Sequence, residues 1–264
     1  MNKIDQKING LKKCNRIGLM THLVLGYPNP MDSLKLAKIL IDAGSDFVEL
    51  QIPFSDPIAD GPTIMHASEV ALRNGATVTK CLELLQKITV YSPIPVLVMC
   101  YYNTVFSFGV EEFCHRMKSL NISGLIVPDI PVDEEKNEKF VHFCLKYDLY
   151  LIRVISPASS KQRLTLNAKR AKGFVYCISR FGVTGTKSTL DPTLQNYLSN
   201  VKKYFSIPIA VGFGISKKEH IDSLQNKADI AIVGSAIIDQ IEKSRNYRQN
   251  YLDTVKKFII NIKH

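Results

Sequence analysis

Short apolar runs rich in β-branched residues recur along the chain and alternate with polar, helix-like segments. The runs start on average about 30 residues apart, the usual length of one strand–helix unit. Eight such runs can be counted. We therefore predict eight strands, over residues 19–25, 46–52, 95–101, 124–127, 149–155, 173–178, 207–212 and 229–234.

Between these runs, apolar residues recur with the period of an α-helix. Residues 110–120 place apolar side chains at i, i+3, i+4 and i+7. Asp191 followed by Pro192 supplies an N-cap and a first-turn proline for a later helix. Residues 3–13 predict an extra short amphipathic helix in front of the first strand.

This alternation has no linker or composition break, so we expect one α/β domain over residues 1–264, a (β/α)8 TIM barrel with an extra N-terminal helix. The alternative is an open doubly wound sheet, which often carries GxGxxG after its first strand. Here that strand ends in LGYPNP, which is no such fingerprint. In a barrel, chemistry lies at the carboxyl ends of the strands.

Composition excludes several classes of protein. With 45% hydrophobic and 22% charged residues, the chain is neither disordered nor fibrous. Its longest apolar run, 94–102, is far shorter than the roughly 20 residues that span a membrane. The basic N-terminus lacks the apolar segment of a signal peptide. We expect no membrane partner and a cytoplasmic protein, or a stromal one if the gene is plastid-encoded.

The formal net charge is +10, from 34 Lys and Arg against 24 Asp and Glu. We find no basic patch interleaved with aromatic residues, so we expect no nucleic-acid partner. Surface lysine and attraction of an anionic small molecule remain as explanations. The six cysteines form no CxxC pair and the six histidines no HxH or HxxxH pair. We therefore expect reduced thiols and no metal site.

The second predicted strand contains an unexpected carboxylate. Strand alternation places Phe47, Glu49 and Gln51 on one side and an apolar set on the other. The apolar set suits the helix-facing side, which points Glu49 into the barrel. A buried carboxylate must be paired or protonated, so Glu49 is either an acid/base or the partner of a structural Arg or Lys.

Eleven residues later, Asp60 lies in a loop punctuated by proline and glycine. An aspartate in such a loop is often a turn former or a helix cap. Two carboxylates near one barrel mouth nevertheless favour function, because one can move a proton while the other holds charge.

The last strand ends predict an anion site. The seventh strand closes as AVGFGIS and the eighth as IVGSAI. Glycines let backbone amides approach a ligand, and a helix that starts at Ser235 would present further N–H groups to it. The alternative is that these glycines only form tight turns between strand and helix.

The thirteen residues 179–191 after the sixth strand predict a lid over the mouth of the barrel, or a surface loop.

ELQIPFSDPIADGPTI, SRFGVTGT, VGFGIS and IVGSAI, at these separations, resemble the tryptophan synthase alpha subunit, and the correspondence covers essentially the whole chain. The resemblance implies a barrel that cleaves indole-3-glycerol phosphate, a small phosphate substrate, to indole and glyceraldehyde 3-phosphate. It implies no cofactor in this chain. Indole would pass to a beta subunit that carries pyridoxal phosphate (PLP), in an alpha2-beta2 heterotetramer.

Site residues follow from the same resemblance, position by position. Glu49 would be the catalytic acid/base, and Asp60 the partner of the indole N–H. Thr184 would close the lid onto Asp60. The phosphate would lie against Gly185, Gly212, Phe213, Gly214, Gly234 and Ser235. The indole pocket would be lined by Tyr101, Ile126, Ile155 and Tyr176, and Asp56, Asn103 and Asp129 would face the beta subunit.

The chain departs from the family pattern at three places. Thr21 and His22 replace a proline and an aromatic residue, and Gln51 replaces a glycine. His22 is either a ring that stacks on indole or a satisfied barrel histidine. Two other functions stay open: a barrel that mainly activates a partner, and a different phosphate-binding isomerase or epimerase, which would not need FSDPIADGP.

Overall fold

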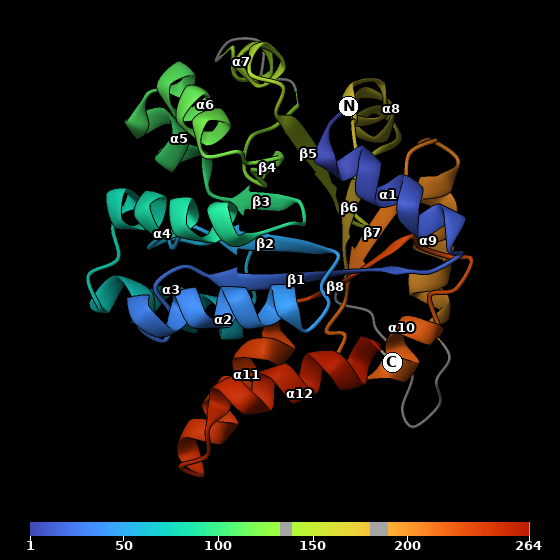
Figure 1. Ribbon diagram of the computed structural model, residues 1–264. Coiled ribbons are helices and arrows are strands. Elements are labelled where there is room, and N and C mark those ends of the chain that lie inside the picture. The colour runs from blue at the N-terminus through green and yellow to red at the C-terminus, as the bar shows by residue number, and fades with distance from the viewer. Residues whose placement is uncertain (133–138, 180–189, 264) are drawn as a thin grey trace.

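The computed structural model describes residues 1–132, 139–179 and 190–263, in which helices and strands alternate (Figure 1). The strands are β1 (Gly18–Val24), β2 (Phe47–Gln51), β3 (Val96–Met99), β4 (Gly124–Ile126), β5 (Tyr150–Ile155), β6 (Val175–Ile178), β7 (Ile209–Gly212) and β8 (Ile230–Val233). The helices are α1 (Lys3–Lys13), α2 (Pro30–Asp42), α3 (Pro62–Arg73), α4 (Val78–Tyr91), α5 (Tyr102–Phe108), α6 (Val110–Ser119), α7 (Phe140–Lys146), α8 (Lys161–Arg170), α9 (Pro192–Lys202), α10 (Lys218–Asp222), α11 (Ser235–Asn246) and α12 (Tyr251–Lys263).

The strands close into a parallel barrel in the order of the sequence, β1 to β8 and back to β1. This confirms the predicted (β/α)8 barrel and excludes the open sheet. The helices surround the strands (Figure 1). The register places His22 of β1 beside Glu49 of β2.

Local sequence explains where several helices begin. Asn29, Thr77, Ser160 and Asp191 each accept a hydrogen bond from a backbone N–H in the first turn of the helix that follows. Such caps satisfy N–H groups that have no partner within the helix. The N-cap predicted at Asp191 is confirmed.

Two apolar layers hold the barrel. The larger core lies between strands and helices and includes Val48 and Leu50. A smaller core fills the barrel interior and includes Phe47, whose ring packs edge-on against Phe174 at a centroid distance of 6.0 Å. Side chains of β2 therefore alternate as the sequence predicted, which directs Glu49 inward.

Helix α1 closes the amino end of the barrel. Its buried side chains Ile4, Ile8 and Leu11 belong to the interior core. Gly173 makes room for this helix: a Cβ there would lie 3.1 Å from Ile4, and its φ of +70° suits glycine. The predicted helix over 3–13 is confirmed and forms the floor of the interior.

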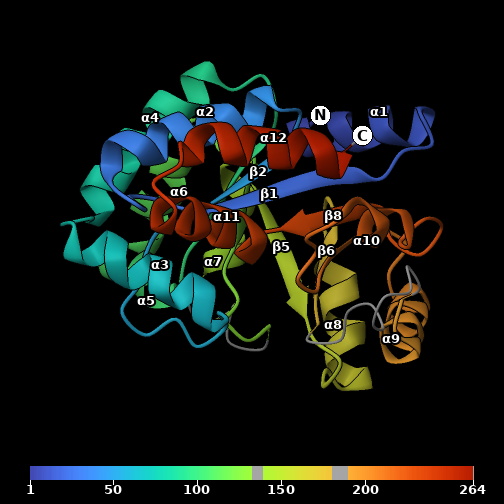
Figure 2. The ribbon, with the colours of Figure 1, turned by 90° about the horizontal axis from the view of Figure 1, so that it is seen from below.

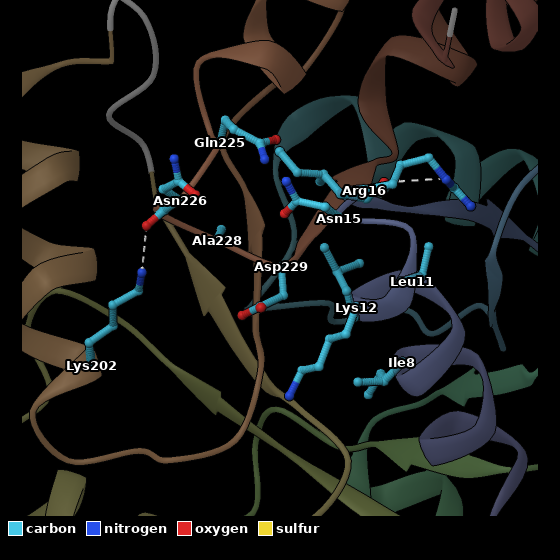
Figure 3. Close-up of a pocket in the computed structure, with 12 residues that line it drawn as sticks. Ile8, Leu11, Lys12, Asn15, Arg16, Lys202, Gln225, Asn226, Ala228 and Asp229 are labelled. Atoms are coloured by element: carbon cyan, nitrogen blue, oxygen red, sulfur yellow. Dashed lines mark hydrogen bonds between the residues drawn. The ribbon is translucent and has the colours of Figure 1, made fainter.

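A small cavity of about 200 Å³ lies at this amino end, between α1 and the loops before β1 and β8 (Figure 3). Several of its charged groups already have partners. Arg16 pairs with both oxygens of buried Asp46 at 2.7 Å, and Lys202 donates to the Asn226 carbonyl at 2.8 Å. Asp229 accepts from the Ile209 N–H at 2.8 Å. These contacts tie the ends of strands together.

The predicted strands agree with the structure, although most observed strands are shorter by one to three residues. The sequence pattern did not single out α5 or α10, short helices of seven and five residues. Helix α12 runs alongside α2 and α11 (Figure 2). Among the described residues, none of the helices has the length and apolar character needed to cross a membrane.

Candidate active site

A cavity of about 710 Å³ opens at the carboxyl ends of the strands. Its lining combines two carboxylates, one imidazole, apolar walls and glycine-rich turns, which is the usual make-up of a ligand pocket. Among the lining residues are His22, Glu49, Asp60, Ile126, Val154, Tyr176, Gly212, Phe213, Gly214, Gly234 and Ser235.

Glu49 lies at the base of this cavity with only 2% of its surface exposed. His22 Nδ1 is 3.3 Å from one carboxylate oxygen, and the Tyr176 hydroxyl donates to the other at 3.5 Å. Burial raises the pKa of Tyr176 well above its usual value, so the hydroxyl keeps its proton and remains a donor. The inward carboxylate is therefore paired, with a histidine in place of the Arg or Lys considered from sequence.

His22 is buried beside the cavity and faces Glu49. Burial alone lowers the pKa of this imidazole, because a charged ring is poorly solvated there. The Glu49 carboxylate, Asp60 and Gln51 outweigh that effect and hold the pKa of His22 above its ordinary value. His22 thus lines the pocket and has Glu49 as a partner at Nδ1, while stacking on indole stays a prediction.

Asp60 reaches the same cavity from the loop before α3. Gln51 Nε2 donates to its carboxylate at 2.7 Å. Burial raises the pKa of Asp60, while the Gln51 amide, His22 and the Tyr101 hydroxyl each lower it. The N-cap of α3 is Gly61, so Asp60 is directed to the cavity instead of capping the helix.

The turns after β7 and β8 form the opposite side of the cavity. Gly214 has a φ of +79°, and a Cβ there would meet no described atom within 4 Å. The turn is thus open toward the cavity. Helix α11 begins at Ser235, so its N-terminal N–H groups are directed at the same side. Gly234 lies against His22, since a Cβ there would be 3.3 Å from that side chain.

In the described part of the chain, no group of three or more His, Cys, Asp or Glu side chains is arranged to hold a metal ion.

The family model for the tryptophan synthase alpha chain matches residues 8–264. The chain is 39% identical over 263 residues to the alpha chain of Thermoanaerobacter sp. (strain X514), which covers 100% of this chain and 99% of that relative. The chain belongs to the tryptophan synthase alpha chain family.

Further relatives agree with this membership. The alpha chain of Desulfotalea psychrophila is 41% identical over 241 residues, 91% of this chain and 94% of its own. The crystal structure of tryptophan synthase subunit alpha from Legionella pneumophila superimposes with a TM-score of 0.90 at 28% identity, covering 100% of this chain and 97% of that one. A tryptophan synthase structure from Mycobacterium tuberculosis, in an aminoacrylate-bound form, gives 0.88 at 27% identity and covers 100% and 98%.

Most residues that the family resemblance assigned to the pocket lie in or beside the cavity. Ile126 and Tyr176 line it. Tyr101 is buried just behind the lining, where its hydroxyl accepts from the Ala59 N–H at 3.0 Å and its ring stacks on Phe54 at 5.2 Å. Tyr101 therefore supports the loop that carries Asp60.

Ile155 is a correction to the predicted pocket. Its side chain belongs to the outer core between β5 and the helices. Val154, one residue earlier, lines the cavity. Successive side chains of a strand point to opposite faces, so an error of one residue in the strand phase exchanges interior and exterior.

The residues assigned to the beta-subunit face lie around the mouth. Asp56 and Asn103 are exposed. Asp129 is half-buried and accepts twice from the Tyr102 N–H, at 2.8 and 3.0 Å, so it also fixes the start of α5. Ile58, on the loop before α3, and Phe106, on α5, are exposed apolar side chains.

Thr184 and Gly185 lie outside the described residues, and their assigned roles remain predictions. Sequence reasoning missed two contacts of the site, that of His22 with Glu49 and that of Gln51 with Asp60. His22 and Gln51 occupy positions where the chain departs from the pattern of its family. These departures from the family pattern were the sequence signal that could have pointed to the two contacts.

Proposed function

We propose that this cavity cleaves indole-3-glycerol phosphate to indole and glyceraldehyde 3-phosphate, the reaction of the tryptophan synthase alpha chain. The observation that carries the proposal is the placement of Glu49 and Asp60 in one cavity, opposite glycine-rich turns and the start of α11. As an alpha chain, the protein is a lyase of tryptophan biosynthesis with no cofactor of its own; PLP belongs to the beta subunit.

The reaction is a retro-aldol cleavage, which needs two proton movements. A proton must reach C3 of the indole ring, and the hydroxyl next to the breaking carbon–carbon bond must lose its proton. Glu49 is the acid/base for these transfers. Asp60 accepts from the indole N–H and stabilises the ring while it carries the extra proton.

The phosphate group binds at the other side of the cavity. The turns at Gly212–Gly214 and Gly234–Ser235 bring backbone N–H groups toward it, and the partial positive charge at the start of α11 favours an anion. Gly185 and Thr184 would complete the site, Gly185 at the phosphate and Thr184 on Asp60. Ile126, Val154 and Tyr176 provide the surface for the indole ring.

The partner is a tryptophan synthase beta subunit, in an alpha2-beta2 complex. Support comes from the mouth of the barrel. Exposed Ile58 lies near Asp56 on the loop before α3, and exposed Phe106 lies with Asn103 on α5, whose first N–H donates to Asp129. Exposed apolar side chains with polar neighbours are typical of protein interfaces. We further propose that residues 1–264 act as one barrel domain, in the cytoplasm or in the stroma of a plastid.

The test is to supply indole-3-glycerol phosphate and measure indole release, with and without a beta subunit. Glu49→Gln keeps the shape of the side chain but cannot exchange the proton. We expect a loss of roughly 10²–10⁴ in kcat. Thermal unfolding within a few degrees of wild type would show that the fold is intact. Retention of more than a tenth of the activity would remove Glu49 from the mechanism.

A further inference from the structure

His22 and Gln51 lie side by side at the mouth of the barrel, between the two carboxylates. His22 Nδ1 is 3.3 Å from Glu49, and Gln51 Nε2 donates to Asp60 at 2.7 Å. His22 and Glu49 are register partners on β1 and β2, and Gln51 follows Glu49 on the same face of β2. Adjacent strands thus set His22, Glu49 and Gln51 next to one another, and Asp60 joins them from the loop before α3.

The middle of this row of four side chains holds one donor atom and one acceptor atom that lack partners. Within the described residues, buried His22 Nε2 and buried Gln51 Oε1 have no group at hydrogen-bond distance. The Gln51 amide nevertheless contributes to the raised pKa of His22. An amide oxygen directed at the ring has this effect, because it stabilises the protonated form. A buried polar atom without a partner is costly, and a bond between His22 Nε2 and Gln51 Oε1, made by a small side-chain rotation, would satisfy both atoms.

The surroundings of His22 explain which form of the ring fits. Glu49 faces it from β2, Asp60 from the following loop, and Tyr176 reaches Glu49 from β6. Gly234 packs against it from the turn after β8 and brings no charge. Two carboxylates and an amide oxygen around one imidazole favour the doubly protonated ring, in which both nitrogens are donors.

We infer that His22 and Gln51 are positioning residues that join Glu49 and Asp60 into one hydrogen-bonded row. His22, as an imidazolium, donates from Nδ1 to Glu49 and from Nε2 to Gln51, and Gln51 donates onward to Asp60. The inference rests on the proposed function for its catalytic meaning. His22 holds one oxygen of Glu49 and Tyr176 approaches the other, which fixes the plane of the carboxylate.

The row predicts a specific dependence on pH. When His22 loses its proton, the charge-assisted bond to Glu49 and the bond to Gln51 are both weakened. Since the pKa of His22 lies above its ordinary value, activity should fall on the alkaline side as this ring titrates. The effect should appear in kcat, because a positioned acid/base acts in the transition state and phosphate binding is unaffected.

The test compares three variants on β1. His22→Phe keeps a ring but removes both nitrogens. It should lower kcat by about 10- to 100-fold, the range for a lost hydrogen bond to a charged group, with KM within about twofold, and abolish the alkaline fall. His22→Asn keeps an amide donor near the Nδ1 position. It should recover part of kcat but not the alkaline fall.

Thr21→Val is the matched control. Thr21 lies on the outward face of β1, where its hydroxyl bonds Ser45 at 2.9 Å, so it reports disturbance of the strand without contact with the row. We expect wild-type kcat and pH profile. An unchanged profile in His22→Phe, or equal losses of kcat in His22→Phe and Thr21→Val, would overturn the inference.

A second measurement separates this inference from the proposed function. An NMR titration of the imidazole signals gives the pKa of His22 without turnover, and the signal is assigned by its loss in His22→Phe. We expect a pKa above the usual 6.5 that falls in Glu49→Gln. A pKa that does not respond to Glu49→Gln refutes the pairing, even if indole is released. Failure to release indole, with the pairing intact, refutes the function alone.

Discussion

The two carboxylates of the cavity differ in what surrounds them. Glu49 is fully buried in the barrel and lies between an imidazole and a phenol. Asp60 is on a loop and depends on the amide of Gln51 and the hydroxyl of Tyr101. Different surroundings allow one carboxyl to exchange protons while the other stays ionised.

Gln51→Met tests the role of the amide at Asp60. Methionine has a similar length but no donor. Burial already raises the pKa of Asp60, and Gln51 opposes that rise, so its removal should raise this pKa further. In the proposed mechanism ionised Asp60 accepts from the indole N–H, so the acid side of the kcat/KM profile should move to higher pH. A profile that stays in place would mean that Gln51 does not set the charge state of Asp60.

The direction of Glu49 could be predicted from sequence because one strand and its alternation are sufficient for it. The pairing of His22 with Glu49 could not. It depends on the register between two strands, which is set by closure of the whole barrel, and local sequence does not contain it. Asp60 is a similar case, since its loop gave its position along the chain but not its contact with Gln51.

At the scale of elements, the turns after β7 and β8 and the start of α11 together form the proposed anion site. Each part alone is an ordinary feature of a barrel. Their convergence on one side of the cavity is what favours phosphate. The strands and α1 were predicted close to their observed bounds. The position that the family resemblance assigned to Ile155 is taken by Val154, one residue earlier, and the apolar run of β5 does not show by itself which face is inside.

Gly214 offers a matched pair of variants for the anion site. Gly214→Asn and Gly214→Asp have nearly the same shape, and both residues tolerate positive φ better than most. Only aspartate adds a negative charge. We expect the KM of Gly214→Asp for the phosphate substrate to be at least tenfold higher than that of Gly214→Asn. The inhibition constant for inorganic phosphate should rise by a similar factor. Equal KM values in the two variants would place the phosphate elsewhere.

At the scale of the molecule, the two ends of the barrel differ in structure: one is closed and the other holds the cavity. The amino end is closed by α1 and by pairs such as Arg16 with Asp46, which bind strand ends to each other. The carboxyl end keeps an open cavity with exposed apolar side chains on its rim. A barrel of this kind keeps its stabilising contacts at the amino end and leaves the carboxyl end free for ligands and partners.

Phe106 tests whether the rim is the surface that meets the beta subunit. It lies on α5, is 59% exposed and does not line the cavity. Phe106→Asp should leave the indole release of the isolated chain unchanged. It should lower the affinity for the beta subunit at least tenfold, because a charge in an apolar interface is costly. Affinity is measured by titrating the beta subunit and following the rise in activity. Val90→Asp is the control, since Val90 is 85% exposed at the end of α4, away from the rim. If both variants respond to the beta subunit as wild type does, the contact lies on another face of the barrel.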